Sequence, residues 1–309
     1  MTIRQLEIFN AIIQTGRFRR AAERLYLAQP SVSQQVQSLE EELGERLFVR
    51  NKNQDLQLTE AGRILQDHAE SILRQCEVAR MEIGRLRQDP VGTIRIGVGG
   101  HQLTSMLPPA LSVFHARFPK VCVDIVNSTT PQLIEMLTSN RLDLAIVNLP
   151  IQAPNLRITS LLTEEMVVAV KRTDPLARKK FITPAGIAKL PLVLYDQTTS
   201  TRKRLNEFFQ ELNITPNVIF ELSSVEAMKH MVAAGLGASI IPYSALSPTW
   251  ERHPLRGIRI NGAPLKRQLG AALPPLSRMP RLVDEVLQLI QKFFRELAKT
   301  IPGAESGPS

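Results

Sequence analysis

Four small polar residues between positions 31 and 37 could read hydrogen-bonding groups on another molecule. Ser31, Ser33, Gln34 and Gln37 carry hydroxyl or amide groups, which both donate and accept hydrogen bonds and bear no charge. A helix face that meets only water usually carries Lys and Glu, whereas one that fits a DNA groove carries Ser, Thr, Gln, Asn or Arg. These residue types therefore predict contact with the edges of DNA bases.

A pair of short helices would position these residues. Residues 18–37 contain two helical patterns with a break between them, and Pro30 suits the first turn of the second helix. Val32, Val36 and Leu39 are spaced by four and three, so one face of that helix is apolar. We interpret the pair as a helix-turn-helix whose second helix reads DNA. The alternative is an ordinary two-helix hairpin.

Positive charge is not concentrated in this stretch. The chain has 38 Lys and Arg against 29 Asp and Glu, for a net charge of +9, but residues 1–58 hold 8 basic and 7 acidic residues. DNA affinity would then depend on local placement, from Arg17, Arg19, Arg20 and Arg24 around the first helix and from Arg50 and Lys52 beyond the second. The basic excess lies in residues 91–309, where it indicates either affinity for anions or only a basic surface.

The segments after the helix pair predict a wing and a long helix. Residues 50–55 form a basic turn between an apolar segment and a strand at 56–58, as in a winged helix-turn-helix. A helix from Thr59 to about Gln88 follows, whose apolar residues keep a heptad spacing: Leu65, Ala69, Ile72, Cys76, Ala79, Ile83 and Leu86. This seam predicts a two-chain coiled coil, which would pair two reading helices; the alternative is packing on its own domain.

A different pattern begins after the break at residues 89–92. Short strands at 93–98, 121–126 and 142–147 alternate with helices at 107–118 and 131–140, which predicts a parallel sheet with right-handed crossovers. Further strands are expected at 166–170, 191–195, 218–222, 238–241 and 267–273, and helices at 201–213, 225–234 and 280–299. The fold class is therefore α/β, with two lobes and a cleft between them.

These patterns divide the chain into four parts. Residues 1–58 are the predicted winged helix-turn-helix, 59–90 the linker helix and 91–302 the two-lobed domain. Lobe I covers about 91–163 and 267–302, and lobe II about 164–266. Residues 303–309 are a predicted disordered tail.

Three loops that each follow a strand and open a helix could bind an anion. Helix N-termini offer free N–H groups and a partial positive charge, so two or three meeting across a cleft would hold a carboxylate or phosphate. The alternative is that their hydroxyl groups only cap helices. The candidate residues are Gly100, His101 and Gln102 in the first loop, Ser128 and Thr129 in the second, and Thr199, Ser200 and Thr201 in the last loop.

Several classes of protein are excluded or disfavoured. The chain has no apolar run of about 18 residues for a membrane span, and its first twenty residues do not resemble a signal peptide. Two cysteines favour a reducing compartment, and we expect a cytoplasmic protein. The five histidines lack metal-binding spacing, and no nucleophile elbow, phosphate loop or dinucleotide fingerprint is present. We expect neither an enzyme nor a cofactor or metal site.

Several of these motifs together resemble the LysR-type transcriptional regulators. The resemblance is carried by AAERL at residues 21–25, AQPSVSQQ at 28–35, LEEELG at 39–44, LFVR at 47–50 and LTEAG at 58–62. A weaker match covers LDLAI at 142–146 and the segment 225–242. The resemblance implies a winged helix-turn-helix, a dimerising linker helix and an effector domain like a periplasmic binding protein.

The resemblance also implies partners and residue roles. Such regulators bind interrupted palindromes in double-stranded promoter DNA, assemble from homodimers into homotetramers, and respond to a small-molecule effector; RNA polymerase is a further candidate partner. By the family pattern, Gln29, Pro30, Ser33 and Gln34 contact bases or lie beside them, and Arg50 serves the wing. The effector is held near His101, Thr129, Asn148 and residues 199–201.

This chain departs from the family pattern at two places. Arg17-Phe18-Arg19 stands where the family often has Ser-Phe-Thr, which removes a hydroxyl cap worth about 1 kcal/mol. His101 replaces a hydroxyl in the first effector loop. A solute-binding protein for transport would share the two-lobed fold, but the reading helix and the missing signal peptide argue against it.

Overall fold

The computed structural model describes residues 1–49, 56–86, 90–99, 106–246, 254–262, 264–275 and 281–307. Within these ranges the chain forms two compact units. The first is Met1–Gly92 with Ser139–Arg141, and the second is Thr93–Thr138 with Leu142–Ser309. Each unit has its own core, so each is described by itself.

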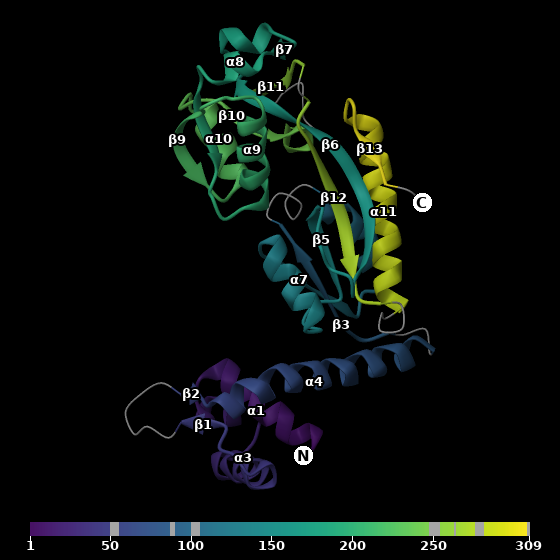
Figure 1. Ribbon diagram of the computed structural model, residues 1–309. Helices are drawn as coiled ribbons and strands as arrows, with labels where there is room; N and C mark the ends of the chain where they lie inside the picture. Colours follow the sequence, from purple (N-terminus) through teal and green to yellow (C-terminus); the bar gives the residue numbers. More distant parts are fainter. Residues whose placement is uncertain are drawn as a thin grey trace. The chain divides into compact units, whose positions relative to one another are not determined.

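The first unit contains the predicted helix pair and wing (Figure 1). α1 (Ile3–Thr15), α2 (Phe18–Arg24) and α3 (Gln29–Leu43) come first. β1 (Phe48–Val49) and β2 (Gln57–Leu58) then pair antiparallel, and α4 (Glu60–Leu86) follows. α1 begins at a capping box, in which the Thr2 hydroxyl accepts from the Gln5 N–H at 3.2 Å and the Gln5 side chain accepts from the Thr2 N–H at 2.8 Å.

One apolar core holds these elements together. Leu6, Phe9 and Ile12 of α1 are buried with Val32 and Leu39 of α3. The wing closes this core through aromatic contacts, because the Phe48 ring lies 5.3 Å from that of Phe9 and 5.5 Å from that of Phe18, centroid to centroid.

The heptad seam of α4 is covered along only part of its length. Leu65, Ala69 and Ile72 pack into the core of the first unit, which is the alternative that the sequence left open for them. Further along the helix, Cys76 is half-buried, Ala79 is exposed and Ile83 is 59% exposed. Ala79 and Ile83, in the second half of the seam, are therefore apolar side chains that remain exposed to solvent in a single chain.

The first turn of α4 lies unusually close to the wing. A Cβ atom added to Gly62 would lie 2.2 Å from the backbone oxygen of Leu47. The Leu47 backbone also connects the two segments, since its oxygen accepts from the Thr59 N–H at 3.0 Å. Only glycine permits this approach, which explains its place in the LTEAG segment.

Replacing this glycine tests the close approach. Gly62→Ala would stabilise an ordinary helix by about 1 kcal/mol, but here the added methyl group should destabilise the unit by about 1–3 kcal/mol. Urea unfolding followed by circular dichroism measures the change. Gln75→Ala, on an exposed part of the same helix, is the control and should leave stability nearly unchanged. A Gly62→Ala variant at least as stable as the wild type would contradict this packing.

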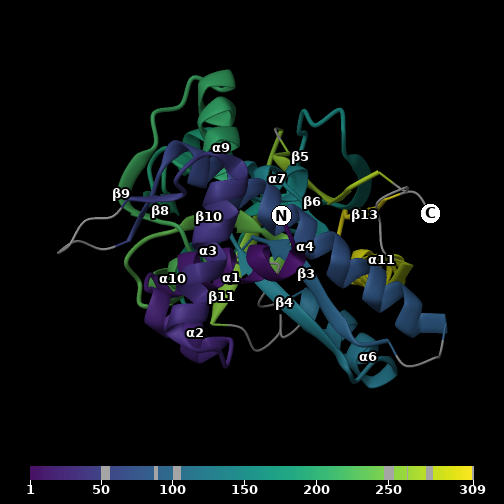
Figure 2. The same ribbon diagram turned by 90° about the horizontal axis from the view of Figure 1, so that it is seen from below.

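The second unit begins with the sheet of lobe I. β3 (Gly92–Val98), α6 (Leu107–Arg117), β4 (Val121–Asn127), α7 (Thr130–Thr138) and β5 (Leu144–Leu149) alternate as predicted, and β3 runs parallel to β5. β12 (Lys266–Leu273) lies antiparallel between β5 and β6 (Arg157–Lys171). α7 packs against β5, while α6 packs against the C-terminal helix α11 (Arg281–Thr300); Figure 2 labels these helices in a second view.

Lobe II is built on the second half of β6. β10 (Ser239–Pro242) and β11 (Leu255–Ile260) pair antiparallel with it, and β7 (Phe181–Ile182) pairs parallel with β11. β8 (Pro191–Tyr195) and β9 (Asn217–Leu222) form a parallel pair. The remaining elements are α8 (Pro184–Ile187), α9 (Ser200–Glu211), α10 (Val225–Ala233) and the 3-10 turns η1 (Pro175–Arg178) and η2 (Tyr243–Leu246).

The structure corrects several sequence expectations. The sheet is mixed rather than parallel, because β12 runs antiparallel to both of its neighbours. β6 begins well before the predicted strand at 166–170, and β11 was not predicted at all. Part of the tail expected to be disordered forms β13 (Glu305–Ser306), which pairs with Thr163 and Leu162 of β6.

A buried ion pair explains why two adjacent glutamates do not end β6. Glu164 is 0% exposed and accepts two hydrogen bonds from Arg267, at 2.9 and 2.7 Å. It also accepts from the Ser244 backbone N–H at 2.8 Å and from the Ser244 hydroxyl at 2.9 Å. This carboxylate therefore joins β6, β12 and η2 where β6 passes from one lobe to the other. Glu165 pairs with Arg259, a side chain that is 44% exposed.

Neutralising the two glutamates separates their contributions. Glu164→Gln leaves Arg267, whose side chain is 9% exposed, without a charged partner, and should lower the free energy of unfolding by about 3–5 kcal/mol. Glu165→Gln is the matched control and should cost less than about 1 kcal/mol, because water screens its partner. Urea denaturation of the two variants compares them. Equal losses would contradict the assigned role of Glu164.

Candidate nucleic-acid interface and ligand-binding lobes

The polar face of α3 points away from the core of the first unit. Val32 is 0% exposed, Val36 4% and Leu39 0%, so the predicted apolar face is the buried one. Gln29, Pro30, Ser31, Gln34 and Gln37 are exposed, and Ser33 is half-buried. The six residues predicted to read DNA therefore lie outside the side of α3 that packs into the core.

Two hydrogen bonds order this surface. The Gln29 amide donates to the Ser33 hydroxyl at 3.2 Å, and the Gln37 amide donates to Glu41 at 2.8 Å. Both pairs are four residues apart, so each is a contact along one side of the helix. The outward face of α3 thus carries neutral donors and acceptors, and these two hydrogen bonds hold the Gln29 and Gln37 side chains in place.

The basic residues Arg19 and Arg20 of α2, which precedes the predicted reading helix α3, are exposed. Arg19 is ion-paired with Glu23 at 3.1 Å, with 85% of its side chain exposed, and Arg20 is exposed as well. Arg17 stands at the N-cap of α2 and makes no side-chain capping bond, as its departure from the family pattern predicts. Arg50 and Lys52, the predicted wing residues, lie outside the described residues.

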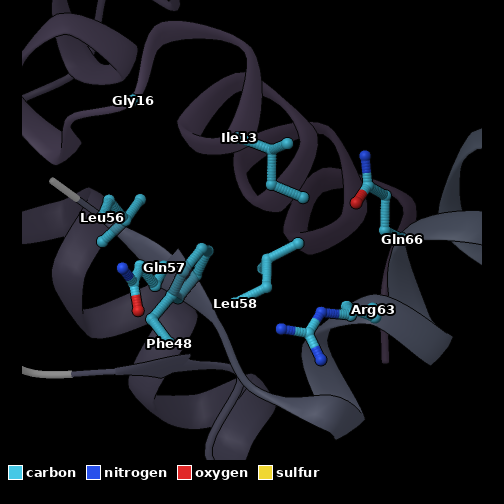
Figure 3. Close-up of a pocket in the computed structure, with 8 residues that line it drawn as sticks. All are labelled: Ile13, Gly16, Phe48, Leu56, Gln57, Leu58, Arg63 and Gln66. Atoms are coloured by element: carbon cyan, nitrogen blue, oxygen red, sulfur yellow. The ribbon is translucent and has the colours of Figure 1, made fainter.

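A surface pocket of about 570 Å³ lies beside the wing and away from the polar face of α3 (Figure 3). Ile13 and Leu58 point into it from α1 and β2, and the Arg63 guanidinium enters from the first turns of α4. Its lining consists of Ile13, Gly16, Phe48, Leu56, Gln57, Leu58, Arg63 and Gln66. No residue of α3 takes part, so this pocket is separate from the predicted reading surface.

In the second unit, the loop before α7 directs three donors at one oxygen. The Ser128 hydroxyl, the Thr129 hydroxyl and the Thr129 N–H all donate to the side-chain oxygen of Gln132, at 2.5, 2.9 and 3.3 Å. Gln132 was not predicted as a site residue, although its position three residues after Thr129 matches a capping box. The predicted anion-binding loop is therefore occupied by a neutral carbonyl group of its own chain.

Asn148 connects the two lobes. Its amide donates to the Ser200 hydroxyl of α9 at 3.0 Å, and its backbone N–H donates to the Thr130 hydroxyl at 3.4 Å. Its side-chain oxygen is buried and has no hydrogen-bond partner within the described ranges. The structure thus brings together Asn148 and Ser200, two of the predicted effector residues, from opposite lobes.

The start of α9 contains another arrangement that the sequence did not reveal. The Thr199 hydroxyl caps the helix by accepting from the Arg202 N–H at 3.2 Å, and Thr201 is half-buried in the first turn. The Arg202 guanidinium is buried, and it donates to the Tyr195 carbonyl at 2.6 Å and to Glu221 at 2.7 Å. Arg202 thus holds α9 against β8 and β9.

Gly100, His101 and Gln102 of the first predicted effector loop lie outside the described residues.

Three observations in the described part of the chain concern metal binding, disulfide formation and membrane insertion. No group of three or more His, Cys, Asp or Glu side chains there could hold a metal ion. Cys76 and Cys122 are both free thiols. None of the helices in those ranges combines the length and hydropathy that crossing a bilayer requires.

The fold defines a class of protein before any comparison. A winged helix-turn-helix followed by a two-lobed α/β domain is the architecture of a DNA-binding regulator that carries a ligand-binding domain. Family models agree with both parts. The model for bacterial regulatory helix-turn-helix proteins of the lysR family matches residues 3–63, and that for the LysR substrate binding domain matches residues 87–295.

Known proteins show the same architecture over nearly the whole chain. The probable RuBisCO transcriptional regulator of Cyanidioschyzon merolae is 31% identical over 274 residues, 87% of this chain and 90% of that protein. The HTH-type transcriptional activator CmpR of Synechocystis is 31% identical over 269 residues, 86% and 87% of the two chains. Full-length CbnR complexed with its target DNA matches with a TM-score of 0.71 at 23% identity, covering 95% of this chain and 100% of that one.

The chain belongs to the LysR family. It is a LysR-type transcriptional regulator with a helix-turn-helix domain and an effector-binding domain.

Proposed function

We propose that this regulator recognises a specific DNA sequence through the outward face of α3 and changes its activity when a small anion binds between its lobes. The observation that carries the first part is the exposed row of uncharged polar side chains on α3. Serine hydroxyls and glutamine amides can match the donor and acceptor pattern of base edges in the major groove. Basic residues outside that face would contribute attraction to phosphate groups without sequence preference.

The DNA contact set follows from exposure and chemistry. Gln29, Pro30, Ser31, Ser33, Gln34 and Gln37 would face base edges, and Arg19, Arg20, Arg50 and Lys52 would face the backbone. Arg19 could exchange its exposed partner Glu23 for a phosphate group at little cost, because exposed ion pairs are weak. CbnR, which shares the fold, has been crystallised with its target DNA, which supports DNA as the partner here.

A dimer would let two reading helices act together. Ala79 and Ile83 form the uncovered second half of the α4 seam, and a second copy of the chain is the partner whose apolar seam matches it. Two-fold symmetry would then fit an interrupted palindrome in promoter DNA. We further propose that two dimers assemble into a tetramer. The protein would act in the cytoplasm and contact RNA polymerase.

The effector proposal depends on the loops before α7 and α9. Donors from Ser128 and Thr129 converge on a single oxygen atom, now that of Gln132, so the loop has the geometry to hold a carboxylate oxygen. The free N–H groups of these helix starts favour negative charge. Asn148 and Ser200 already meet across the lobes, so an anion held by the two loops would lie where lobe closure can respond to it. The proposed effector residues are Gly100, His101, Gln102, Ser128, Thr129, Asn148, Thr199, Ser200 and Thr201.

A double substitution tests α3 as the reading helix. Ser33→Ala with Gln34→Ala removes donors and acceptors but no charge. We expect affinity for a selected genomic site to fall by about tenfold or more, because each good base contact contributes about 1–3 kcal/mol. Binding to random DNA, which depends on phosphate contacts, should hardly change. Fluorescence anisotropy with both duplexes measures the two affinities.

A matched control uses the same helix. Gln35→Ala removes an exposed glutamine that lies outside the predicted base-reading set, and should leave both affinities close to those of the wild type. Equal losses on specific and random DNA in the double variant would remove Ser33 and Gln34 from the reading surface.

The effector site is tested by ligand-induced thermal stabilisation. Acetate, malonate, succinate, 2-oxoglutarate and benzoate are the probes, and a ligand at 100 times its Kd stabilises a protein by about 2.7 kcal/mol. For any acid that raises the Tm of the wild type, Thr129→Val should reduce the shift by more than half. Thr138→Val is the control, because its hydroxyl lies at the other end of α7 and donates to the Ile134 carbonyl.

Two results would count against this part of the proposal. An unchanged shift in Thr129→Val would remove that residue from the site. No stabilisation of the wild type by any of the acids would contradict a carboxylate effector.

A further inference from the structure

Tyr26, in the turn between α2 and α3, combines two unfavourable features. Its side chain is 96% exposed, the largest value for any big hydrophobic side chain within the described ranges. Its backbone lies in the left-handed region, with φ of +54°. A bulky residue rarely adopts this conformation, and an aromatic ring gains little by standing in water. Neither packing nor backbone preference explains a tyrosine here.

The turn itself requires the left-handed conformation. The Leu27 N–H donates to the Ala22 carbonyl at 2.9 Å and the Tyr26 N–H donates to the Glu23 carbonyl at 3.2 Å, which closes the end of α2. Such helix ends usually place glycine, or sometimes asparagine, at the left-handed position. Leu27 then packs against the core, so the turn is fixed on both sides. The side chain at position 26 is therefore not needed to build the turn.

The position of Tyr26 in the chain suggests what its side chain does. It precedes Gln29 and Pro30, the start of the proposed reading helix, and the turn residues Tyr26 and Ala28 are both exposed. In a helix-turn-helix the first helix crosses the sugar-phosphate backbone, while the N-terminal residues of the second contact base edges. The turn that joins the two helices is therefore close to the backbone. Tyrosine is among the residues that donate hydrogen bonds to phosphate oxygens.

We infer that the Tyr26 hydroxyl donates a hydrogen bond to a DNA phosphate and thereby positions α3 in the groove. This inference rests on the proposed function of α3. The arginines of α2 attract phosphate groups through charge, whereas a neutral phenol on a fixed turn supplies direction. On the left-handed backbone that the turn requires, the ring stands exposed and away from the core.

The experiment uses the full-length protein with Tyr26→Phe and Tyr26→Asn. Fluorescence anisotropy measures affinity for a genomic duplex selected by the wild type and for a random duplex of equal length, at several salt concentrations. Tyr26→Phe should weaken binding to both duplexes by about two- to tenfold, the effect of one hydrogen bond. The dependence of affinity on salt should keep its slope, because no charge is lost.

Tyr26→Asn adds a readout that separates function from folding. Asparagine tolerates the left-handed region, so this variant should have a Tm equal to or above that of the wild type while binding DNA at least as weakly as Tyr26→Phe. A lower Tm for Tyr26→Asn would show that the ring stabilises the turn and would overturn the inference.

The remaining outcomes are distinguishable. Wild-type affinity in Tyr26→Phe, for a protein that binds its selected duplex specifically, would overturn the role of Tyr26 and leave the proposed function intact. Loss confined to the selected duplex would also overturn it, because the phenol would then read a base. A wild type that shows no preference for any genomic duplex would instead overturn the proposed function.

Discussion

The rotation of α3 about its own axis is the constraint on which the DNA-binding part of this protein depends. Side chains around an α-helix are 100° apart, so the residues anchored inward decide which ones face outward. Burial of Val32, Val36 and Leu39 in a core shared with α1 and Phe48 fixes that rotation. The close approach of Gly62 to Leu47 closes the same core from α4. The base readout proposed for the neutral side chains would therefore depend on apolar packing on the other side of the helix.

In the regulatory unit, the corresponding constraint is the passage of β6 through both lobes. Glu164 joins β6, β12 and η2 by hydrogen bonds that water cannot replace, so the crossing is held at its centre. Nearer the candidate effector loops, the two lobes meet through the exposed hydrogen bond between Asn148 and Ser200. A firm crossing combined with one exposed hydrogen bond between the lobes would allow them to reorient around the proposed effector without losing their cores.

The sequence predicted the parts of this structure that follow from local patterns. The helix pair and the alternating strands of lobe I have short-range signals, which the structure bears out. The start of β6 was missed because polar and charged residues interrupt its apolar pattern, and its Glu164 depends on Arg267, 103 residues further along the chain. β11 was missed because arginines and a glycine interrupt its apolar pattern. The contact of Asn148 with Ser200 and the burial of Arg202 likewise depend on tertiary structure. Tyr26 lies between two of the motifs that carry the family resemblance, but its exposure and backbone conformation can be seen only in three dimensions.

In the proposed function, a symmetric pair of α3 helices recognises one DNA sequence. Footprinting of genomic fragments recovered with the purified full-length protein tests it most directly. We expect a shared motif with two protected half-sites on one face of the duplex, whose centres are about 34 Å, or a multiple of that distance, apart. Recovered fragments without a common motif, or protection that spreads evenly along them, would contradict it.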